Sequence, residues 1–386
     1  MQFKLHLVNH HDLEMFWRFY MNVILTATEI DTWAKAYPRH AQELLPQLIA
    51  RLVLCSSPKI VDYNFPIEKG IQFAGYDGVL KSGEATSYFP EGKSVWEFGT
   101  NDNALEKFRS DIEKRHSEPL DINIADTTFI FVTLKIWNHR KSIEETVNES
   151  KNRYNWKDVR IIDASKIALW LQSHDAVAVW FANSIGKHID GIRTIEDFWS
   201  DHCESTSPKL GVDYFLLGRD SQISKLSEWL EKKSGSLTLV SESALESTLF
   251  IAALFLSQKE KYSAVINKTL IIESTSVWHD LVRRYEKDGL YIPVFNFTED
   301  IRCPREMSIV LPVAKYSPLS KITKNVDSIK IEKRSKAVYH KVLETLEFKT
   351  DDFAKIEAET KRSFLPLYRI ITTVPTRKKP IWLSEK

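Results

Sequence analysis

The sequence predicts an α/β protein in which a mixed β-sheet unit, built in the order αβββαβ, precedes a second α/β unit and C-terminal helices. Residues 127–134, TTFIFVTL, form the most apolar β-branched run, which is typical of a buried central strand. Residues 41–54 carry Leu, Ile and Val at helical spacing, which indicates an amphipathic helix. After residue 212, strand-like and helix-like segments alternate, which favours a parallel sheet.

In the first half of the chain, helices are expected before and after three short strands. Leu105, Phe108 and Ile112 lie at helical spacing, and the Gly, Ser and Pro residues of 81–93 indicate a loop. Pro46 is expected in the first turn of its helix, where proline is tolerated. The expected elements are helices at 23–38 and 41–54, strands near 70–76, 78–82 and 93–98, a helix at 102–116, a strand at 127–134, a helix at 142–154, a strand at 159–163, and helices at 164–173, 174–186 and 194–201.

The second half is expected to hold a separate α/β unit after a polar linker at 201–211. Its expected elements are a helix at 219–232, a strand at 236–241, a helix at 244–258, strands at 269–274, 290–295 and 307–313, and helices at 333–348 and 351–365. The expected organisation is an N-terminal extension at 1–27, a first domain at 28–203, a second at 208–325, and a C-terminal helical segment and tail at 326–386.

Composition excludes several classes of protein. With 386 residues, 43% hydrophobic and 27% charged, the chain is globular rather than disordered, and its length favours more than one domain. A net charge of +1 gives no overall basic field for nucleic acid, so such binding must come from local patches. Cys55, Cys203 and Cys303 form no CxxC pair, which argues against a zinc ribbon or a disulfide scaffold. No apolar run approaches about 20 residues, so we expect a cytoplasmic protein without membrane contact.

Two carboxylates occupy strand positions where an apolar residue is expected if the strand only packs in a core. Asp77 ends the segment IQFAGYD, and Glu97 lies in SVWEFG on the next expected strand. Neighbouring antiparallel strands would bring both carboxylates within a few ångströms of each other, where they repel unless a cation lies between them. Mg²⁺, with Mn²⁺ as a substitute, is the ion that such ligands favour. The alternative is that Asp77 belongs to an ordinary Asp-Gly turn and that Glu97 is solvated.

A phosphate-processing site also needs a positive group near these carboxylates. The position two residues after Glu97 is Gly99, which supplies no charge. Lys107, on the following helix, is expected to reach back over the strand edge. Lys114 and Arg115 lie further along that helix and are candidates for contacts with a phosphate backbone.

Asp77, Glu97 and a lysine displaced to the next helix resemble the PD-(D/E)XK, or restriction-endonuclease-like, nucleases in their migrated-lysine form. Residues 28–200 look like the N-terminal nuclease module of large prokaryotic NTPase-containing proteins thought to act in defence against phage. The resemblance rests on the stretches GYDG, PEGKSVWEFGTN, EKR, TTFIFVT, WKDVRIIDASKIALWL and DGIRTIEDFW.

The resemblance implies a Mg²⁺-dependent DNA endonuclease of low sequence specificity. In that case Asp77 and Glu97 hold the metal, and Lys107 acts in catalysis. The family tends to have Pro-Arg-Arg-Trp where this chain has Leu-Lys-Ile-Trp, so Lys135 is the phosphate-binding candidate that remains. Some members also use an acid from the first helix, for which Glu43 is the candidate. The alternative is a nuclease fold that binds nucleic acid or protein without catalysis.

The segment YFLLGRDSQISKLSEWL at 214–230 resembles the entry to STAND-type and AAA-type NTPases. A phosphate-binding loop should follow the next strand, but 237–250 reads LTLVSESALESTLF, without glycine or lysine. Glu242 and Glu246 would repel a triphosphate there. We therefore expect a degenerate NTPase-like domain for sensing, scaffolding or assembly, through self-association or a protein partner; an atypical nucleotide site is the alternative.

Overall fold

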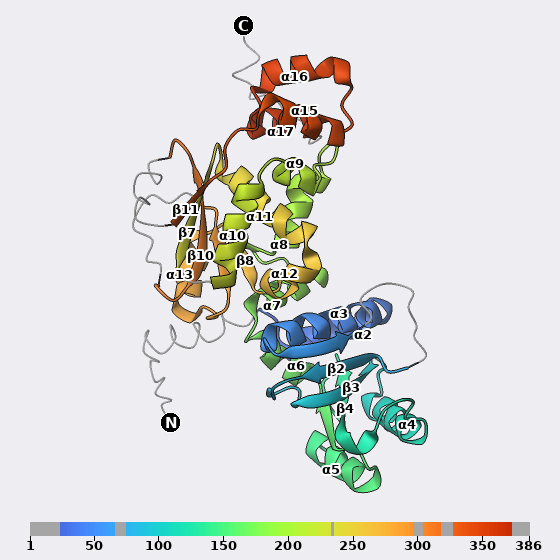
Figure 1. Ribbon diagram of the computed structural model, residues 1–386. Coiled ribbons are helices and arrows are strands. Elements are labelled where there is room, and N and C mark those ends of the chain that lie inside the picture. Colours follow the sequence, from blue (N-terminus) through green and yellow to red (C-terminus); the bar gives the residue numbers. More distant parts are fainter. Residues whose placement is uncertain (1–23, 66–74, 233–234, 296–303, 318–326, 373–386) are drawn as a thin grey trace, which may run out of the picture. The chain divides into compact units, whose positions relative to one another are not determined.

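A computed structural model describes residues 24–65, 75–232, 235–295, 304–317 and 327–372. The chain forms two compact units that separate between His188 and Ile189 (Figure 1). The sequence instead placed the boundary near residue 203. The difference arises because the short strand β6 (Ile192–Arg193) pairs with a strand of the second unit, Ile192 opposite Ile272.

The first unit is built around a five-stranded mixed sheet in the order β1-β2-β3-β4-β5. Strands β1, β2 and β3 are antiparallel, whereas β3, β4 and β5 are parallel. This succession agrees with the predicted αβββαβ order of an α/β unit. Its elements are α2 (Ala27–Ala36), α3 (Pro38–Ser56), β1 (Ile60–Asn64), β2 (Gly78–Ser82), β3 (Gly92–Gly99), α4 (Ala104–Ser117), β4 (Thr127–Thr133), α5 (Ile143–Arg153), β5 (Asp158–Ile162), α6 (Ala164–Leu171) and α7 (Asp175–Ser184).

Two local predictions for this unit need correction. The first strand of the meander lies at Ile60–Asn64, which the sequence reading did not mark as a strand. The strand expected near 70–76 falls mostly on 66–74, outside the described residues, and the described Gly75 and Tyr76 are not in a strand. Helix α3 begins at Pro38, so Pro46 lies inside the helix rather than in its first turn.

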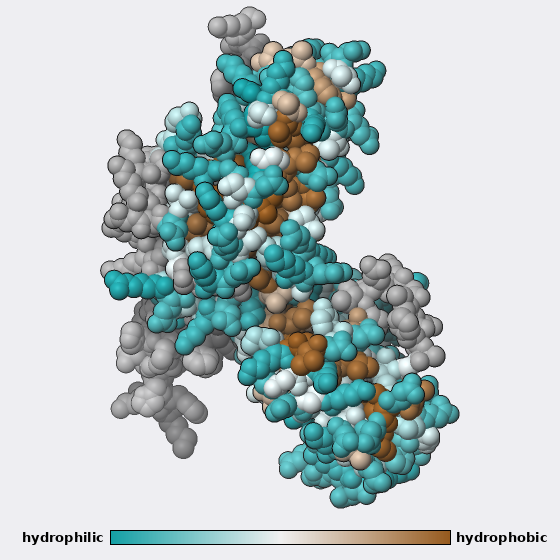
Figure 2. All heavy atoms as spheres, viewed as in Figure 1, coloured by the Kyte–Doolittle hydropathy of each residue, from teal (hydrophilic) through white to brown (hydrophobic). Residues whose placement is uncertain are grey.

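Helices cover both faces of this sheet: α2 and α3 lie on one side, and α4 and α5 on the other (Figure 1). All seven residues of β4 are buried, as expected, and β4 is an interior strand between β3 and β5. On the α4 side, Val95, Phe129 and Phe131 pack against Phe108 and Ile112. Figure 2 shows mainly hydrophilic side chains on the outer surfaces of α4 and α5, consistent with apolar faces turned to the sheet.

The second unit contains a six-stranded sheet in the order β11-β7-β10-β9-β8-β6. Its strands are parallel except for β6, which confirms the expected parallel sheet. The sequence reading missed the short edge strands β6 and β11. The remaining elements are α8 (Ile195–Trp199), α9 (Val212–Leu216), α10 (Asp220–Lys232), β7 (Ser236–Ser241), α11 (Ala244–Ser257), α12 (Lys259–Ile266), β8 (Thr269–Ile272), α13 (Thr275–Arg284), β9 (Leu290–Pro293), β10 (Ser308–Ala314), β11 (Asp327–Lys330), α15 (Lys336–Thr345), α16 (Phe353–Thr360) and α17 (Phe364–Ile371).

Helix α11 is the centre of the second unit's core, because its residues from Glu246 to Phe255 are all buried. A helix that is mostly apolar and buried on every side is typical of one enclosed within a domain. Among the helices of the described ranges, none has the length and apolar character needed to cross a bilayer. Cys55 and Cys203 are buried, and Cys303 lies outside the described residues.

Candidate active site

Asp77 and Glu97 lie close together at the end of the β2–β3 pair. Gly78, the first residue of β2, pairs with Trp96, so Asp77 precedes the paired region on one side and Glu97 follows Trp96 on the other. The two carboxylates are close enough for the Asp77 charge to raise the pKa of Glu97. Because Val95 packs toward α4, Glu97, two residues further on, also faces α4. Oδ2 of Asp77 accepts a hydrogen bond from the Phe98 backbone N–H at 2.8 Å, which fixes this carboxylate against β3.

Helix α4 presents a charged stripe to these carboxylates. Lys107, Asp111 and Arg115 are spaced four residues apart and therefore lie along one helix face. The Arg115 guanidinium donates to Oε1 of Glu97 and to the carbonyl oxygen of Gly75, and it lies 4.7 Å from the centre of the Tyr76 ring. Arg115 thus connects β3 to the segment that carries Asp77.

The stem of Lys107 packs beside Gly99 of β3, two residues after Glu97. A Cβ added at Gly99 would lie 3.2 Å from Cγ of Lys107 and 2.4 Å from a ring carbon of Phe131. The second distance is too short for any real side chain, so glycine is required for Lys107 and Phe131 to pack here. Nζ of Lys107 lies 2.6 Å from Oδ1 of Asp111. The stem of Lys107 therefore packs against Gly99, while Asp111 of the same helix binds its ammonium.

Burial and mutual repulsion dominate the electrostatics of this cluster. Glu97 is 3% exposed, and burial, followed by the Asp77 charge, raises its pKa to about 8, although Arg115 opposes the shift. Burial also raises the pKa of Asp111; Lys107 opposes this shift and the Asp77 charge adds to it. Three carboxylates share two cations, Lys107 and Arg115, so full ionisation leaves one negative charge uncompensated. A proton on Glu97 is one way to remove this charge, and a bound cation is another.

The residues fit a hydrated cation better than a closed metal cage. Within the ranges that the structure describes, no three His, Cys, Asp or Glu side chains converge closely enough to enclose an ion. Mg²⁺, however, usually keeps several waters and takes only one or two protein carboxylates. Oδ2 of Asp111 is buried without a hydrogen-bond partner among the described residues, and the cluster carries surplus negative charge. Both features suit a cation held by Asp77 and Glu97 through part of its coordination sphere.

The residues proposed for phosphate contacts have different surroundings. Lys114 is exposed on α4. Arg115 is 8% exposed and bonded within the site, so it holds the site together in this arrangement. Lys135 is buried, with Nζ 3.0 Å from Oδ1 of Asp102, whose side chain is largely exposed. Glu43 lies on α3, where Arg39 pairs with it at 3.7 Å, and the structure does not bring it into the α4 cluster.

Asp111 was not singled out by the sequence reading. The signal was nevertheless present, because Lys107, Asp111 and Arg115 form a four-residue repeat beside the apolar pair Phe108 and Ile112. A charged repeat that adjoins the apolar stripe of a helix faces the edge of the core and not open solvent. The same pattern explains why Arg115 is buried while Lys114 is exposed.

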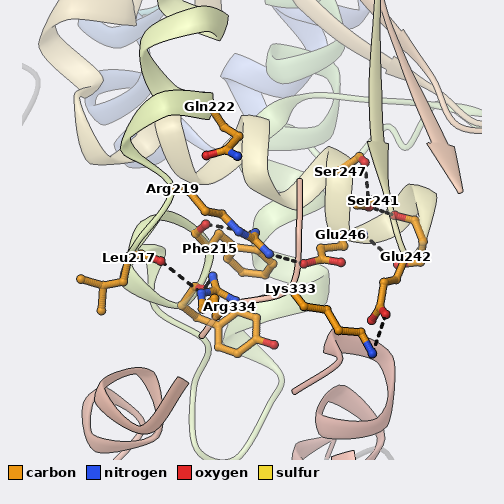
Figure 3. Close-up of polar contacts among 12 residues, drawn as sticks. Phe215, Leu217, Arg219, Gln222, Ser241, Glu242, Glu246, Ser247, Lys333 and Arg334 are labelled. Carbon is orange, nitrogen blue, oxygen red and sulfur yellow. Dashed lines mark hydrogen bonds and ion pairs between the residues drawn. The ribbon is translucent and has the colours of Figure 1, made fainter. Parts of the chain in front are cut away.

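In the second unit, the predicted strand–loop–helix is present, but its connection is very short. Strand β7 ends at Ser241 and α11 begins at Ala244, so only two residues lie between them. Ser243 caps the helix by accepting from the Glu246 N–H at 3.1 Å. The Ser247 hydroxyl donates to Ser241 Oγ at 2.8 Å, and Ser241 donates to the Ser243 carbonyl at 2.6 Å (Figure 3). The turn therefore directs much of its hydrogen bonding inward, without an open loop of backbone N–H groups.

Glu242 of this turn and Glu246 of α11 are paired with cations from elsewhere in the unit. Arg219 donates to Glu246 at 2.5 Å, and both side chains are buried (Figure 3). Glu242 forms an ion pair with Lys333 at 2.9 Å. The neighbouring Arg334 is also buried and donates to the Leu217 carbonyl at 3.1 Å; burial, reinforced by the Arg219 charge, lowers its pKa to about 10. Internal ion pairs therefore occupy the region where the family resemblance would place a nucleotide.

Comparison of the chain with protein-family models and with curated proteins finds no match.

Proposed function

We propose that the first unit is a metal-dependent nuclease that hydrolyses phosphodiester bonds in DNA. The observation that carries this proposal is the position of Lys107: its stem packs against Gly99 of β3, two residues after Glu97, and the Asp77 carboxylate lies close to that glutamate. An ammonium group, two neighbouring acids and a surplus of negative charge are the parts that metal-assisted phosphodiester hydrolysis requires.

Each side chain has a role that follows from its position. Asp77 and Glu97 would hold a Mg²⁺ ion, which when bound acidifies water and neutralises charge on the phosphate. The Lys107 ammonium places a fixed positive charge where negative charge develops on the phosphate oxygens. Arg115 holds Glu97 and the Gly75 carbonyl in place, so the Asp77 segment stays aligned with β3. Lys114, exposed on the same helix, is available for the DNA backbone.

The second unit is proposed as a regulatory or oligomerising module. Two of its observations support this: the β7–α11 turn bonds to itself, and Arg219 already has an anionic partner in Glu246. Together with the family resemblance of the first unit, this favours a low-specificity effector of defence against phage, controlled through the second unit.

Supercoiled plasmid provides the direct test. The purified chain should nick plasmid in Mg²⁺ or Mn²⁺ but not in EDTA, and Asp77→Asn or Glu97→Gln should abolish nicking. Glu113→Gln is the matched control, because Glu113 is an exposed carboxylate on the same helix, paired only at the surface with Arg153. Nicking that survives in either site variant, or that persists in EDTA, contradicts the mechanism.

A second candidate is a DNA-binding or protein-binding module without catalysis. It is favoured by the internal bonding of both acids, Glu97 to Arg115 and Asp77 to the Phe98 N–H, which stabilises the unit without any metal. Fluorescence anisotropy with labelled duplex DNA separates the two. Binding that does not depend on metal, together with no strand breaks in Mg²⁺ or Mn²⁺, would support the binding module.

A further inference from the structure

Asp111 is a buried acid to which the proposed mechanism assigns no role. It is 6% exposed and lies on the face of α4 that is turned to the sheet, between Lys107 and Arg115. Oδ1 is 2.6 Å from Nζ of Lys107, while Oδ2 is buried without a hydrogen-bond partner among the described residues.

Stability alone does not explain a carboxylate at this position. An exposed Lys–Asp pair four residues apart on a helix contributes only about 0.3–0.5 kcal/mol, and for a buried acid the loss of hydration can exceed what the pairing returns. Leaving a buried polar atom unsatisfied costs about 1–3 kcal/mol, and more for a charged group. An apolar side chain beside Phe108 and Ile112 would avoid that cost. Asp111 therefore lowers the stability of the fold relative to an apolar residue, which points to a role in the site.

The contact with Lys107 indicates what that role is. Packing over Gly99 fixes Lys107 only as far as Cγ. Beyond Cγ the chain still has rotatable bonds, and the side chain is 31% exposed, so the ammonium could turn into solvent. The Asp111 carboxylate removes that freedom, since it binds the ammonium within one helical turn.

We propose that Asp111 is the positioning residue of the nuclease site: it holds the ammonium of Lys107, whose stem packs against Gly99 of β3, near the Asp77 carboxylate that acts on Asp111. This inference rests on the proposed function of the first unit. Asp111 acts through Lys107 and touches no reacting atom, so its loss should affect the chemical step and not DNA binding.

The kinetic test uses Asp111→Asn, Lys107→Met and the double variant, with Glu113→Gln as the matched control on the same helix. Asp111→Asn should lower kcat about 10–100-fold with KM unchanged, as expected for a misplaced catalytic group. In the Lys107→Met background the same change should cause no further loss, because its target is already absent. Wild-type kcat in Asp111→Asn, or equal losses in both backgrounds, overturns the proposal.

A readout that does not need activity separates this inference from the proposed function. Brief acetylation with acetic anhydride, followed by peptide mass spectrometry, measures how reactive each lysine is. Lys107 should react several-fold faster in Asp111→Asn than in the wild type, while Lys114 reacts equally in both. If the wild type shows no metal-dependent cleavage but the Lys107 reactivity changes as expected, the nuclease proposal fails and the positioning contact stands. Unchanged Lys107 reactivity overturns the positioning role whether or not the protein cleaves DNA.

Discussion

The raised pKa of Glu97 gives a measurable prediction about stability. Between about pH 5 and pH 8 the folded chain keeps a proton on Glu97 that the unfolded chain has lost, because burial and the Asp77 charge raise the pKa in the fold from 4.5 to about 8. The free energy of unfolding should therefore fall as pH rises through this window. Glu97→Gln, which mimics the protonated acid and keeps an acceptor for Arg115, should lack this contribution.

The size of the effect follows from the same pKa difference. One pKa unit corresponds to about 1.4 kcal/mol, which sets a ceiling of about 5 kcal/mol for Glu97. Relaxation of the Arg115 pair and water entry on ionisation reduce this to about 2–4 kcal/mol. The two proteins should be similarly stable at pH 5, and Glu97→Gln should be the more stable one at pH 8.5 by that amount.

Urea denaturation at pH 5, 7 and 8.5 measures the difference directly. Buried tryptophans lie in both units, Trp96 beside Glu97 among them, so fluorescence follows the unfolding of both units, and a change that appears only in Glu97→Gln belongs to the first. Subtracting the wild-type curve from the Glu97→Gln curve cancels the other titrating groups, since they are common to both proteins. Parallel pH profiles for the two proteins would refute the argument that Glu97 is buried beside uncompensated negative charge.

Three further predictions follow from the structure. Mg²⁺ should raise the melting temperature of the wild type more at pH 8.5 than at pH 6, because the ion and the Glu97 proton compete, and Asp77→Asn should abolish this rise; an equal rise in the variant would contradict the site. Gly99→Ala should destabilise the first unit by about 1–3 kcal/mol in urea and impair cleavage, because its Cβ would meet the Phe131 ring; unchanged stability would show that the close packing is wrong. Glu246→Ala should lower the free energy of unfolding by about 3–5 kcal/mol, because it leaves Arg219 buried and unpaired. Glu242→Ala, which removes the partner of the partly exposed Lys333, should lower it by less than about 1 kcal/mol. Equal losses of stability in calorimetry would count against the buried ion pair.

Local patterns were sufficient for the elements whose burial is uniform or regularly periodic. The β-branched run at 127–133 is a strand buried along its whole length, and the apolar spacing of Phe108 and Ile112 places α4 against the sheet. The edge strand at 60–64 was missed because most of its residues are exposed, so its sequence carries little hydrophobic signal. Strand β6 has only two residues and exists because β8 pairs with it, and pairing of this kind leaves no local pattern.

For the candidate site, the sequence by itself determined which residue types are present: two acids near strand ends, a glycine after the second, and a charged helix that follows. Only the tertiary structure decided the partners of those charges. Arg115 is bonded to Glu97, and Asp111 becomes a buried member of the site, because α4 packs on β3 with one particular face. A charge acquires its role from the groups within a few ångströms of it, and these come from distant parts of the chain that only the packing brings together.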